Sequence, residues 1–271
     1  MSEPLFKVRG LEVALPDMAR KPLIGKAPMV EILKGLDFDL PRRSVTGIVG
    51  ESGSGKSTLG RALVRLLEPS AGSIEFEGRD IAHLSEAQLK PLRRNLQMIF
   101  QDPMSSLNPR RTIGAIIAAP LKQNGLGDNL AERVAEALRR VGLPEAFAQR
   151  YRHELSGGQR QRVGIARALA LSPDFVLADE IVSGLDVSTQ AQILTLLEQL
   201  AAEMGLTVAF ISHDLSVIRR LCQQVIVMQH GRIVEAGPTD QLFEAPQQEY
   251  TRELIAAIPL PEIDAEWLST G

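Results

Sequence analysis

A glycine-rich segment near the start of the chain contains the residue types that bind phosphate groups. It reads Gly50-Glu51-Ser52-Gly53-Ser54-Gly55-Lys56-Ser57, with Thr58 next. The segment fits the pattern G-x-x-x-x-G-K-[ST], in which backbone N–H groups surround phosphates, the lysine contacts the terminal ones and the hydroxyl can bind Mg²⁺. A β-branched run at Val45–Val49 precedes it and helical spacing over Lys56–Leu67 follows. Because the pattern requires a strand before it and a helix after it, the sequence predicts a phosphate-binding loop rather than an accidental match.

A second glycine-rich segment, Leu155-Ser156-Gly157-Gly158-Gln159, precedes the helical pattern Gly157–Leu171. Small residues and a polar side chain at the start of a helix favour the binding of an anion. One nucleotide hardly needs two such loops from one polypeptide. We therefore expect each loop to supply half of a different site.

Two carboxylates, Asp179 and Glu180, directly follow the apolar run Phe175–Ala178, which is typical of a buried parallel strand. A carboxylate at the carboxyl end of a buried strand beside a phosphate loop can hold Mg²⁺. We expect Asp179 to bind the metal together with Ser57, and Glu180 to polarise the attacking water as a general base. The alternative is a solvated acidic pair at the end of a strand.

Two further polar residues follow a predicted strand and a short apolar run. His213 comes just after Thr207–Ile211, and Gln101 follows Met98-Ile99-Phe100. His213 is expected to contact the terminal phosphate and the water, the alternative being a histidine at a helix start beside the N-cap candidate Asp214. The amide of Gln101 is expected to reach Mg²⁺ or water, the alternative being an ordinary surface glutamine.

Composition restricts the compartment and the partners. The net charge of −3 gives no argument for nucleic acid, and the basic clusters at 139–140 and 160–162 fit solvated faces or contacts to partner subunits. Cys222 is the only cysteine, which suits a reducing cytoplasm. The first residues lack the features of a signal peptide, and no uncharged run approaches the ~18–20 residues of a membrane span. The expectation is a cytosolic protein that reaches a membrane through a partner.

The pattern of strands and helices predicts an α/β fold in one domain, residues 1–271. The expected strands are Phe6–Leu15, Val30–Leu40, Val45–Val49, Ser73–Phe76, Phe175–Ala178, Thr207–Ile211 and Val225–Met228, with Gly231–Glu235 completing a hairpin. The expected helices are Lys56–Leu67, Ser85–Arg94, Thr112–Gln123, Leu130–Val141, Gly157–Leu171, Ser188–Met204 and Leu215–Leu221. No strand pattern interrupts the middle of the chain. We therefore expect a core at 5–100 and 172–237, a helical lobe at about 101–171 and a helical tail at about 238–271.

These motifs together resemble those of an ABC transporter ATPase subunit over roughly Phe6 to Gly237. The matching set is the phosphate loop, Gln101, the LSGGQ segment, Asp179-Glu180, Ser183-Gly184-Leu185-Asp186 and His213, in this order. The resemblance implies a P-loop RecA-like core with an antiparallel β subdomain and an inserted helical lobe. It also implies that two subunits enclose ATP and Mg²⁺, so that Ser156, Gly157, Gly158 and Gln159 contact ATP bound to the partner. Asp186 would lie in a loop that communicates across the dimer.

A narrower resemblance concerns the branch of ABC ATPases that serves peptide, opine and nickel importers. Residues 100–109, FQDPMSSLNP, and the tail Glu249-Tyr250-Thr251-Arg252-Glu253-Leu254 are similar to segments of that branch. It implies a second ATPase subunit, more often a different chain than a copy, together with two transmembrane permease subunits and an extracytoplasmic solute-binding protein. The chain would lie peripherally on the cytoplasmic face of the inner membrane.

Three positions depart from the family pattern. Leu15 occupies the place of an adenine-stacking aromatic, whose loss would cost about 1–3 kcal/mol by analogy with base–aromatic contacts. Ile181 replaces a common proline, and Gly184 replaces alanine. Two alternatives to an importer subunit stay open. One is a soluble ABC ATPase acting on chromosomes or ribosomes, and the other is a nucleotide-binding scaffold with weak hydrolysis.

Overall fold

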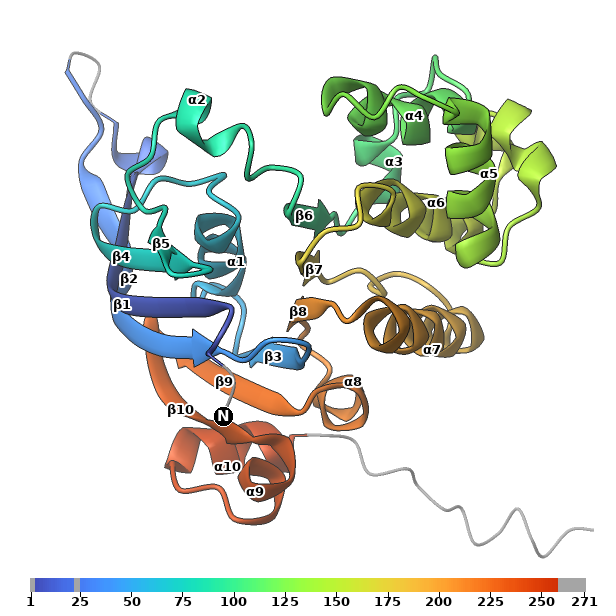
Figure 1. Cartoon of the computed structure of the whole chain (residues 1–271). Helices are drawn as coiled ribbons and strands as arrows, with labels where there is room; N and C mark the ends of the chain where they lie inside the picture. The colour runs from blue at the N-terminus through green and yellow to red at the C-terminus, as the bar shows by residue number, and fades with distance from the viewer. Residues whose placement is uncertain (1–2, 22–24, 258–271) are drawn as a thin grey trace, which may run out of the picture.

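Two β-sheets form the centre of the computed structural model, which describes residues 3–21 and 25–257 (Figure 1). A six-stranded sheet has the order β10-β9-β3-β8-β7-β6, and a four-stranded sheet has the order β2-β1-β4-β5. The strands are β1 (Phe6–Pro16), β2 (Met29–Leu40), β3 (Val45–Val49), β4 (Ala71–Phe76), β5 (Arg79–Asp80), β6 (Leu96–Ile99), β7 (Phe175–Asp179), β8 (Thr207–Ile211), β9 (Gln224–Gln229) and β10 (Arg232–Pro238).

Helices flank both sheets and form a separate group on one side (Figure 1). The α-helices are α1 (Lys56–Leu63), α2 (Glu86–Leu89), α3 (Pro103–Ser106), α4 (Ile113–Gln123), α5 (Leu130–Arg140), α6 (Gly157–Leu169), α7 (Val187–Met204), α8 (Leu215–Leu221), α9 (Thr239–Glu244) and α10 (Glu249–Ala256). Short 3₁₀ helices cover Met18–Arg20, Glu145–Gln149 and Arg152–Glu154.

The larger sheet is parallel except for its last strand. Strands β3, β6, β7, β8 and β9 pair in parallel, and β10 pairs antiparallel with β9. Every residue of β3, β7 and β8 is buried, as expected for strands covered on both faces. Asp179 pairs with Ile211, and Ile48 pairs with the same residue from the other side. The residues that follow these strands therefore meet at one edge of the sheet.

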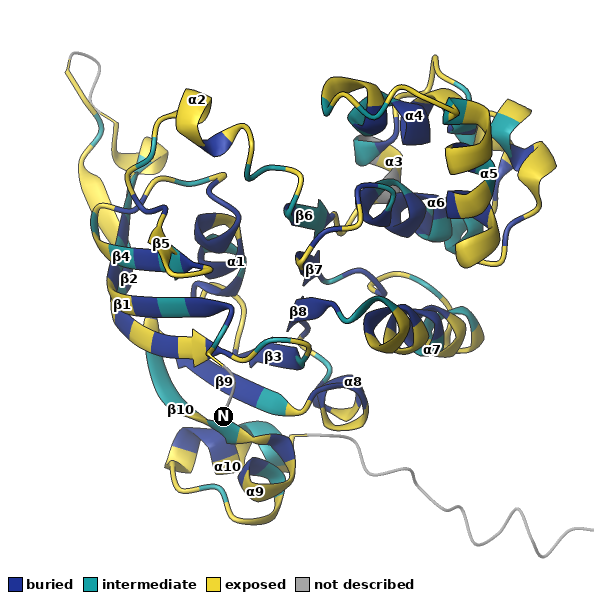
Figure 2. Ribbon diagram, viewed as in Figure 1, coloured by how far each residue is buried: buried dark blue, intermediate teal, exposed yellow. Residues whose placement is uncertain are grey.

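The two faces of the parallel sheet contact different parts of the chain. Along β7, Val176 and Ala178 pack with the cluster that contains α7 and the helices α4–α6, whereas Phe175 and Leu177 pack with the cluster that contains α1 and the antiparallel sheet. This alternation follows from the two-residue period of a strand. The buried residues lie between the layers (Figure 2). Phe6 joins the second cluster, with its ring centroid 4.7 Å from that of Phe175.

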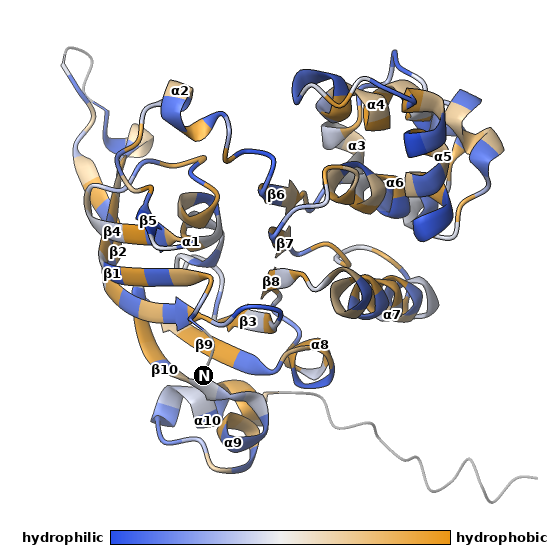
Figure 3. Ribbon diagram, viewed as in Figure 1, coloured by the Kyte–Doolittle hydropathy of each residue, from blue (hydrophilic) through white to orange (hydrophobic). Residues whose placement is uncertain are grey.

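Helices α3–α6 pack together beside the sheets, between β6 and β7 in the sequence (Figure 1). In α5 the buried residues Val134, Ala137 and Leu138 recur at helical spacing. Its opposite face is polar (Figure 3) and exposed (Figure 2). A stripe of this kind stabilises a helix by burying its apolar face against its neighbours.

Two predicted helices are much shorter than the sequence suggests. The first helix ends at Leu63, not Leu67, because Arg65 adopts a left-handed φ of 54° and its guanidinium donates to the carbonyl of Ile81 at 2.7 Å. The segment Ser85–Arg94 is helical only over Glu86–Leu89. Pro91 follows and lacks the amide hydrogen that the helix would need. The tail is helical through Ala256, and its last part, including Trp267, lies outside the described residues.

Candidate active site

The first glycine loop connects β3 to α1 in a tightly wrapped conformation. Gly50, Gly53 and Gly55 have φ angles of 142°, 80° and 103°, which side chains other than glycine rarely adopt. A Cβ on Gly50 would lie 2.1 Å from the Met228 carbonyl oxygen, and one on Gly55 would lie 2.9 Å from Leu33 Cδ2. Gly53 has open space around it. The loop is thus packed against β9 and β2 on one side and open on the other.

Lys56 is buried at the first position of α1, and its ammonium group bridges the loop. Its Nζ donates to the carbonyl oxygens of Gly50 and Glu51, at 2.7 Å each. Burial lowers the pKa of Lys56, whereas the nearby charges of Glu180, Asp179 and Glu51 act to raise it. The cation therefore lies at the centre of the loop with carboxylates close by.

Ser57 and Asp179 form the oxygen pair expected for a metal ion. Ser57 Oγ donates to Asp179 Oδ1 at 3.1 Å. Asp179 is 3% exposed, and this burial raises its pKa, while the bond from Ser57 and the charges of Arg61 and Lys56 act to lower it. One carboxylate and one hydroxyl, completed by phosphate oxygens and water, suit the way Mg²⁺ is bound beside nucleotides. Within residues 3–21 and 25–257 no group of three or more His, Cys, Asp or Glu side chains could bind a metal alone.

Glu180 lies at the junction of three elements in a strained backbone conformation. Its φ of 49° is left-handed, a conformation that costs about 1–3 kcal/mol for a residue other than glycine and that concentrates at functional sites. Its amide donates to the Ile211 carbonyl at 3.0 Å. Gln101 Nε2 donates to Glu180 Oε2 at 2.9 Å, and His213 Nδ1 lies 3.7 Å from Glu180 Oε1. The structure thus brings Gln101 and His213 to one carboxylate.

These elements surround a hollow of about 530 Å³. It is lined by Ile32, Ser52, Gly53, Gly55, Lys56, Ser57, Thr58, Glu180 and His213. This volume is within the range of small-molecule and cofactor sites. The start of α1 has no capping side chain, and the buried Ser54 Oγ has no hydrogen-bond partner in the described part of the chain. A helix start without a side-chain cap, a central lysine and a glycine-rich backbone fit a phosphate chain.

Leu15 is absent from the lining of this hollow, and Ile32 is present. Leu15 is only partly buried, pairs with Val30 across β1 and β2, and packs against the cluster of the antiparallel sheet. Ile32 was not singled out from the sequence, because it is an ordinary strand residue with no local signal. Gly184 has a φ of 76°, which explains a glycine where alanine is usual, and Ile181 is buried in the core.

The second glycine loop contributes no residue to this hollow. It starts α6, in the group of helices apart from α1 (Figure 1). Ser156 caps the helix: its Oγ accepts from the Gln159 amide at 3.3 Å, and Gln159 Oε1 accepts from the Ser156 amide at 3.0 Å. A Cβ on Gly157 would lie 3.3 Å from Leu185 Cδ2. The loop is therefore ordered by contacts within its own chain.

Asp186 caps α7 beside this loop. Its carboxylate accepts from the Thr189 amide at 2.9 Å, from Thr189 Oγ1 at 2.7 Å and from Ser188 Oγ at 2.8 Å. These bonds lower the pKa of Asp186 to about 2, and the bond from the Thr189 amide has the largest effect. The negative charge at the start of α7 is stabilised by its own helix.

A contact that no local sequence pattern indicates links the tail to the phosphate loop. The Glu51 amide donates to Tyr250 Oη at 3.0 Å. The two residues are separated by 199 positions. Tyr250 stood out only as part of a tail similar to that of one family branch.

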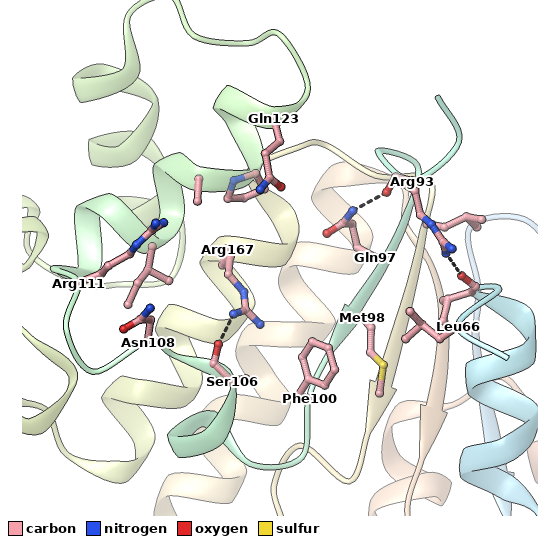
Figure 4. A pocket seen from close by; sticks show the side chains of 15 residues that line it. Leu66, Arg93, Gln97, Met98, Phe100, Ser106, Asn108, Arg111, Gln123 and Arg167 are labelled. Atoms are coloured by element: carbon pink, nitrogen blue, oxygen red, sulfur yellow. Dashed lines mark hydrogen bonds between the residues drawn. The ribbon is translucent and has the colours of Figure 1, made fainter. Parts of the chain in front are cut away.

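A further hollow of about 400 Å³ lies between the sheet core and the helices α3–α6 (Figure 4). Leu66, Met98 and Phe100 line its core side, and Asn108, Arg111 and Arg167 line the helical side. Arg167 Nη1 donates to the Ser106 carbonyl at 2.6 Å, and burial lowers the pKa of Arg167.

A glycine loop between a buried parallel strand and a helix, with carboxylates at the end of a neighbouring strand, defines a P-loop nucleotide-binding ATPase. Comparison with known families narrows this class. Residues 33–183 match the family model described as ABC transporter. The chain belongs to the ABC transporter family.

Relatives and solved structures agree with this assignment. A Brucella ovis protein that is named as a peptide import ATP-binding protein is 50% identical over 264 residues, which cover 97% of this chain and 81% of that protein. Glutathione import ATP-binding protein GsiA of Salmonella typhi is 51% identical over 263 residues, 96% of this chain and 42% of that protein. The dimeric ATP-binding cassette MJ0796, in a post-hydrolysis state with ADP and Pi, has a TM-score of 0.75 at 29% identity, covering 86% of this chain and 98% of that one. CbiO1 of Clostridium perfringens, part of the complex cbiONQ, has a TM-score of 0.76 at 29% identity, covering 95% and 97%.

The sequence-based prediction of an α/β ABC ATPase is therefore confirmed, in fold and in family. The substrate of such an ATPase is ATP. In the described part of the chain, no helix combines the length and the apolarity needed to cross a bilayer. The roles of individual site residues stay predictions.

Proposed function

We propose that this chain is the ATP-hydrolysing subunit of a membrane importer and couples ATP binding and hydrolysis to the uptake of peptides or related small solutes, such as opines or nickel complexes. Relatives named for peptide import and for glutathione import match nearly the whole chain at 50–51% identity. The observation that carries the enzymatic part is the Ser57–Asp179 hydrogen bond of 3.1 Å beside the buried Lys56.

The proposed roles follow the geometry of the site. Lys56 and the amides of residues 50–58 hold the phosphates. Ser57 and Asp179 hold Mg²⁺, which would neutralise phosphate charge when bound. Gln101 can assist through its amide oxygen, because its nitrogen donates to Glu180.

Glu180 accepts a proton from the attacking water, and His213 positions that water and the terminal phosphate. The 3.7 Å separation of His213 Nδ1 from Glu180 Oε1 leaves both side chains facing the same hollow.

A second ATPase subunit completes the site. The loop at residues 155–159 lines no part of the hollow that holds Lys56. We propose that Ser156, Gly157, Gly158 and Gln159 contact ATP bound to the partner subunit, with Asp186 at the same interface. The dimeric state of MJ0796 with ADP and Pi supports this arrangement. The partner is a different chain in our preferred form and a copy of this chain in the alternative.

The remaining partners are two permease subunits and an extracytoplasmic solute-binding protein, with this chain on the cytoplasmic face of the inner membrane. The hollow in Figure 4 is a suitable surface for a permease segment. Leu66 and Phe100, which line it, are 53% and 42% exposed, although both are large and apolar. Exposed apolar side chains of this kind at a hollow often mark protein contacts.

The proposal is tested by reconstituting the chain with the products of neighbouring permease genes in proteoliposomes. Uptake of a labelled oligopeptide pool with the cognate binding protein should require ATP. It should fail when Glu180 is replaced by glutamine in this chain. An ATPase that remains active and never associates with membrane subunits would contradict the importer role and favour the soluble alternative. Binding of ATP with no phosphate release in the full complex would favour the scaffold alternative.

A further inference from the structure

We propose that Tyr250, in the C-terminal helix α10, is a positioning residue for the phosphate loop and sets the affinity for nucleotide through one peptide group. The inference rests on the proposed assignment of residues 50–58 as the nucleotide site. It assigns a role in that site to the tail, which follows the motifs of the nucleotide site in the sequence.

The peptide group between Gly50 and Glu51 is held at both ends. Its N–H, on Glu51, donates to Tyr250 Oη at 3.0 Å. Its carbonyl, on Gly50, accepts from Lys56 Nζ at 2.7 Å. Tyr250 and Lys56 therefore fix the orientation of the same peptide plane from opposite sides. Rotation of that plane would move the acceptor that holds the lysine.

Burial and hydrogen bonds hold Tyr250 and the segment before α10 in place. Tyr250 is 9% exposed and its neighbour Thr251 is 1% exposed. Glu235 in β10 accepts from the amide of Gln247 at 2.8 Å and from that of Gln248 at 3.1 Å, which fixes the chain just before α10.

The hairpin that carries Glu235 also contacts the loop directly. Gly231, in the β9–β10 turn, donates its amide to the Ser54 carbonyl at 3.0 Å. The hairpin and α10 thus form one outer support for the phosphate loop. Neither Tyr250 nor Gly231 borders the hollow that holds Lys56.

This arrangement predicts a specific kinetic effect. Without the phenol hydroxyl, the Glu51 amide has no acceptor from the tail, and the loop spends less time in the conformation that Lys56 needs. When only a fraction of the molecules is competent to bind, the apparent affinity falls by that fraction. The chemical step uses Glu180, which has no contact with the tail among the hydrogen bonds described, and is unaffected once nucleotide is bound.

The experiment compares Tyr250→Phe with the wild-type chain, each assembled with its partner subunits. The aromatic ring and its packing are kept, and only the hydroxyl is lost. We expect the KM for ATP and the Kd for a fluorescent ADP analogue to rise about two- to tenfold, the range of one net hydrogen bond. We expect kcat to stay within about twofold of wild type, because the variant weakens binding and leaves the chemical step intact. Tyr151→Phe is the matched control: Tyr151 lies among the lobe helices and is 39% exposed, so both constants should stay unchanged.

A purely structural role would give a different result. Partial unfolding lowers the concentration of active enzyme, so Vmax would fall with an unchanged KM, and that outcome would overturn the proposal. Lys56→Ala distinguishes an error in the proposed nucleotide site from an error in the role given to Tyr250. If Lys56→Ala binds ADP normally, the proposed nucleotide site is wrong. If Lys56→Ala loses binding and Tyr250→Phe does not weaken it, only the role of Tyr250 is wrong.

Hydrogen exchange provides a test that needs no variant. Because coupling between two sites is reciprocal, ADP binding to the wild-type complex should slow amide exchange in residues 249–256. Exchange in α10 that is identical with and without ADP would count against the proposal.

Discussion

Gly158 and Thr189 pack so closely that a Cβ built on the glycine would lie 2.5 Å from Cγ2 of the threonine. This separation is far below van der Waals contact, so the first turn of α6 packs on the first turn of α7 at a distance that only glycine permits. The same threonine donates its hydroxyl to Asp186 at 2.7 Å. Because both helix starts share Thr189, the second glycine loop and the cap of α7 form one packed unit.

Replacing Gly158 by alanine should disturb this contact. Gly158→Ala is expected to destabilise the fold by about 1–3 kcal/mol, the usual cost of overpacking. Thr189→Ser removes the Cγ2 methyl group and keeps the hydroxyl that donates to Asp186. The double variant should therefore recover most of the free energy of unfolding, measured by denaturant titration.

Gly164→Ala is the matched control for that series. Gly164 lies in the same helix, and a Cβ there meets nothing within 4 Å. Alanine should stabilise this position by up to about 1 kcal/mol, because glycine is the weaker helix former. Equal losses at 158 and 164, or a double variant no more stable than Gly158→Ala, would contradict the packing account.

Glu180→Gln should separate nucleotide binding from hydrolysis. The amide keeps the size of the side chain and cannot accept a proton from water, so turnover should fall by roughly 10²–10⁴ while ATP binding persists. Phosphate release and nucleotide affinity are measured on the assembled complex. Glu77→Gln is a suitable control, since Glu77 also has a left-handed φ, of 54°, and lies on the antiparallel-sheet side of the molecule. Near-normal hydrolysis in Glu180→Gln would remove Glu180 from the role of general base.

Asp179→Asn should affect the empty protein and the loaded protein in opposite directions. A buried carboxylate is costly to desolvate, so the neutral amide should raise the melting temperature of the nucleotide-free chain at neutral pH. The stabilisation that Mg²⁺ adds to ATP binding should be lost with the charge. Thermal melts with and without Mg²⁺ and ATP measure both effects. Asp174→Asn, at the opposite end of β7, is the control and should keep the stabilisation that Mg²⁺ adds. If Asp174→Asn also loses this stabilisation, the effect of Asp179→Asn is a general effect of charge removal.

Acid should weaken the cap of α7 in a defined pH range. The folded-state pKa of Asp186 is about 2, below its ordinary value of 3.8. A carboxylate with a lowered pKa contributes stability that is complete above the ordinary value and is lost as the pH falls toward the folded-state value. The melting temperature of wild type should therefore fall relative to that of Asp186→Asn between about pH 4 and pH 2, by this linkage. If the melting temperatures of the two proteins change in parallel across this range, the Asp186 carboxylate does not stabilise the start of α7.

Local sequence patterns predicted much of the fold and of the site. The apolar runs at 45–49, 175–178 and 207–211 form buried parallel strands, because such strands must be apolar on both faces. Since parallel strands end at one edge of the sheet, the residues that follow them lie close together. The structure brings His213 within 3.7 Å of Glu180 in this way.

Contacts between distant segments could not be predicted in this manner. No local pattern pairs Tyr250 with Glu51, which lies 199 residues earlier. The early end of α1 depends on the left-handed Arg65 and on its bond to the Ile81 carbonyl, a tertiary contact that outweighs helical propensity. Ile32 lines the hollow only because β2 lies beside the phosphate loop.

The reciprocal hydrogen bonds between Ser156 and Gln159 have a consequence for the speed of assembly. A loop that is already ordered loses little conformational entropy when another molecule meets it. An encounter at this surface therefore needs no folding step before the contact forms. The rate at which another molecule binds this surface should then depend on collision and on the movement of whole helices. It should depend only weakly on the dynamics of the loop itself.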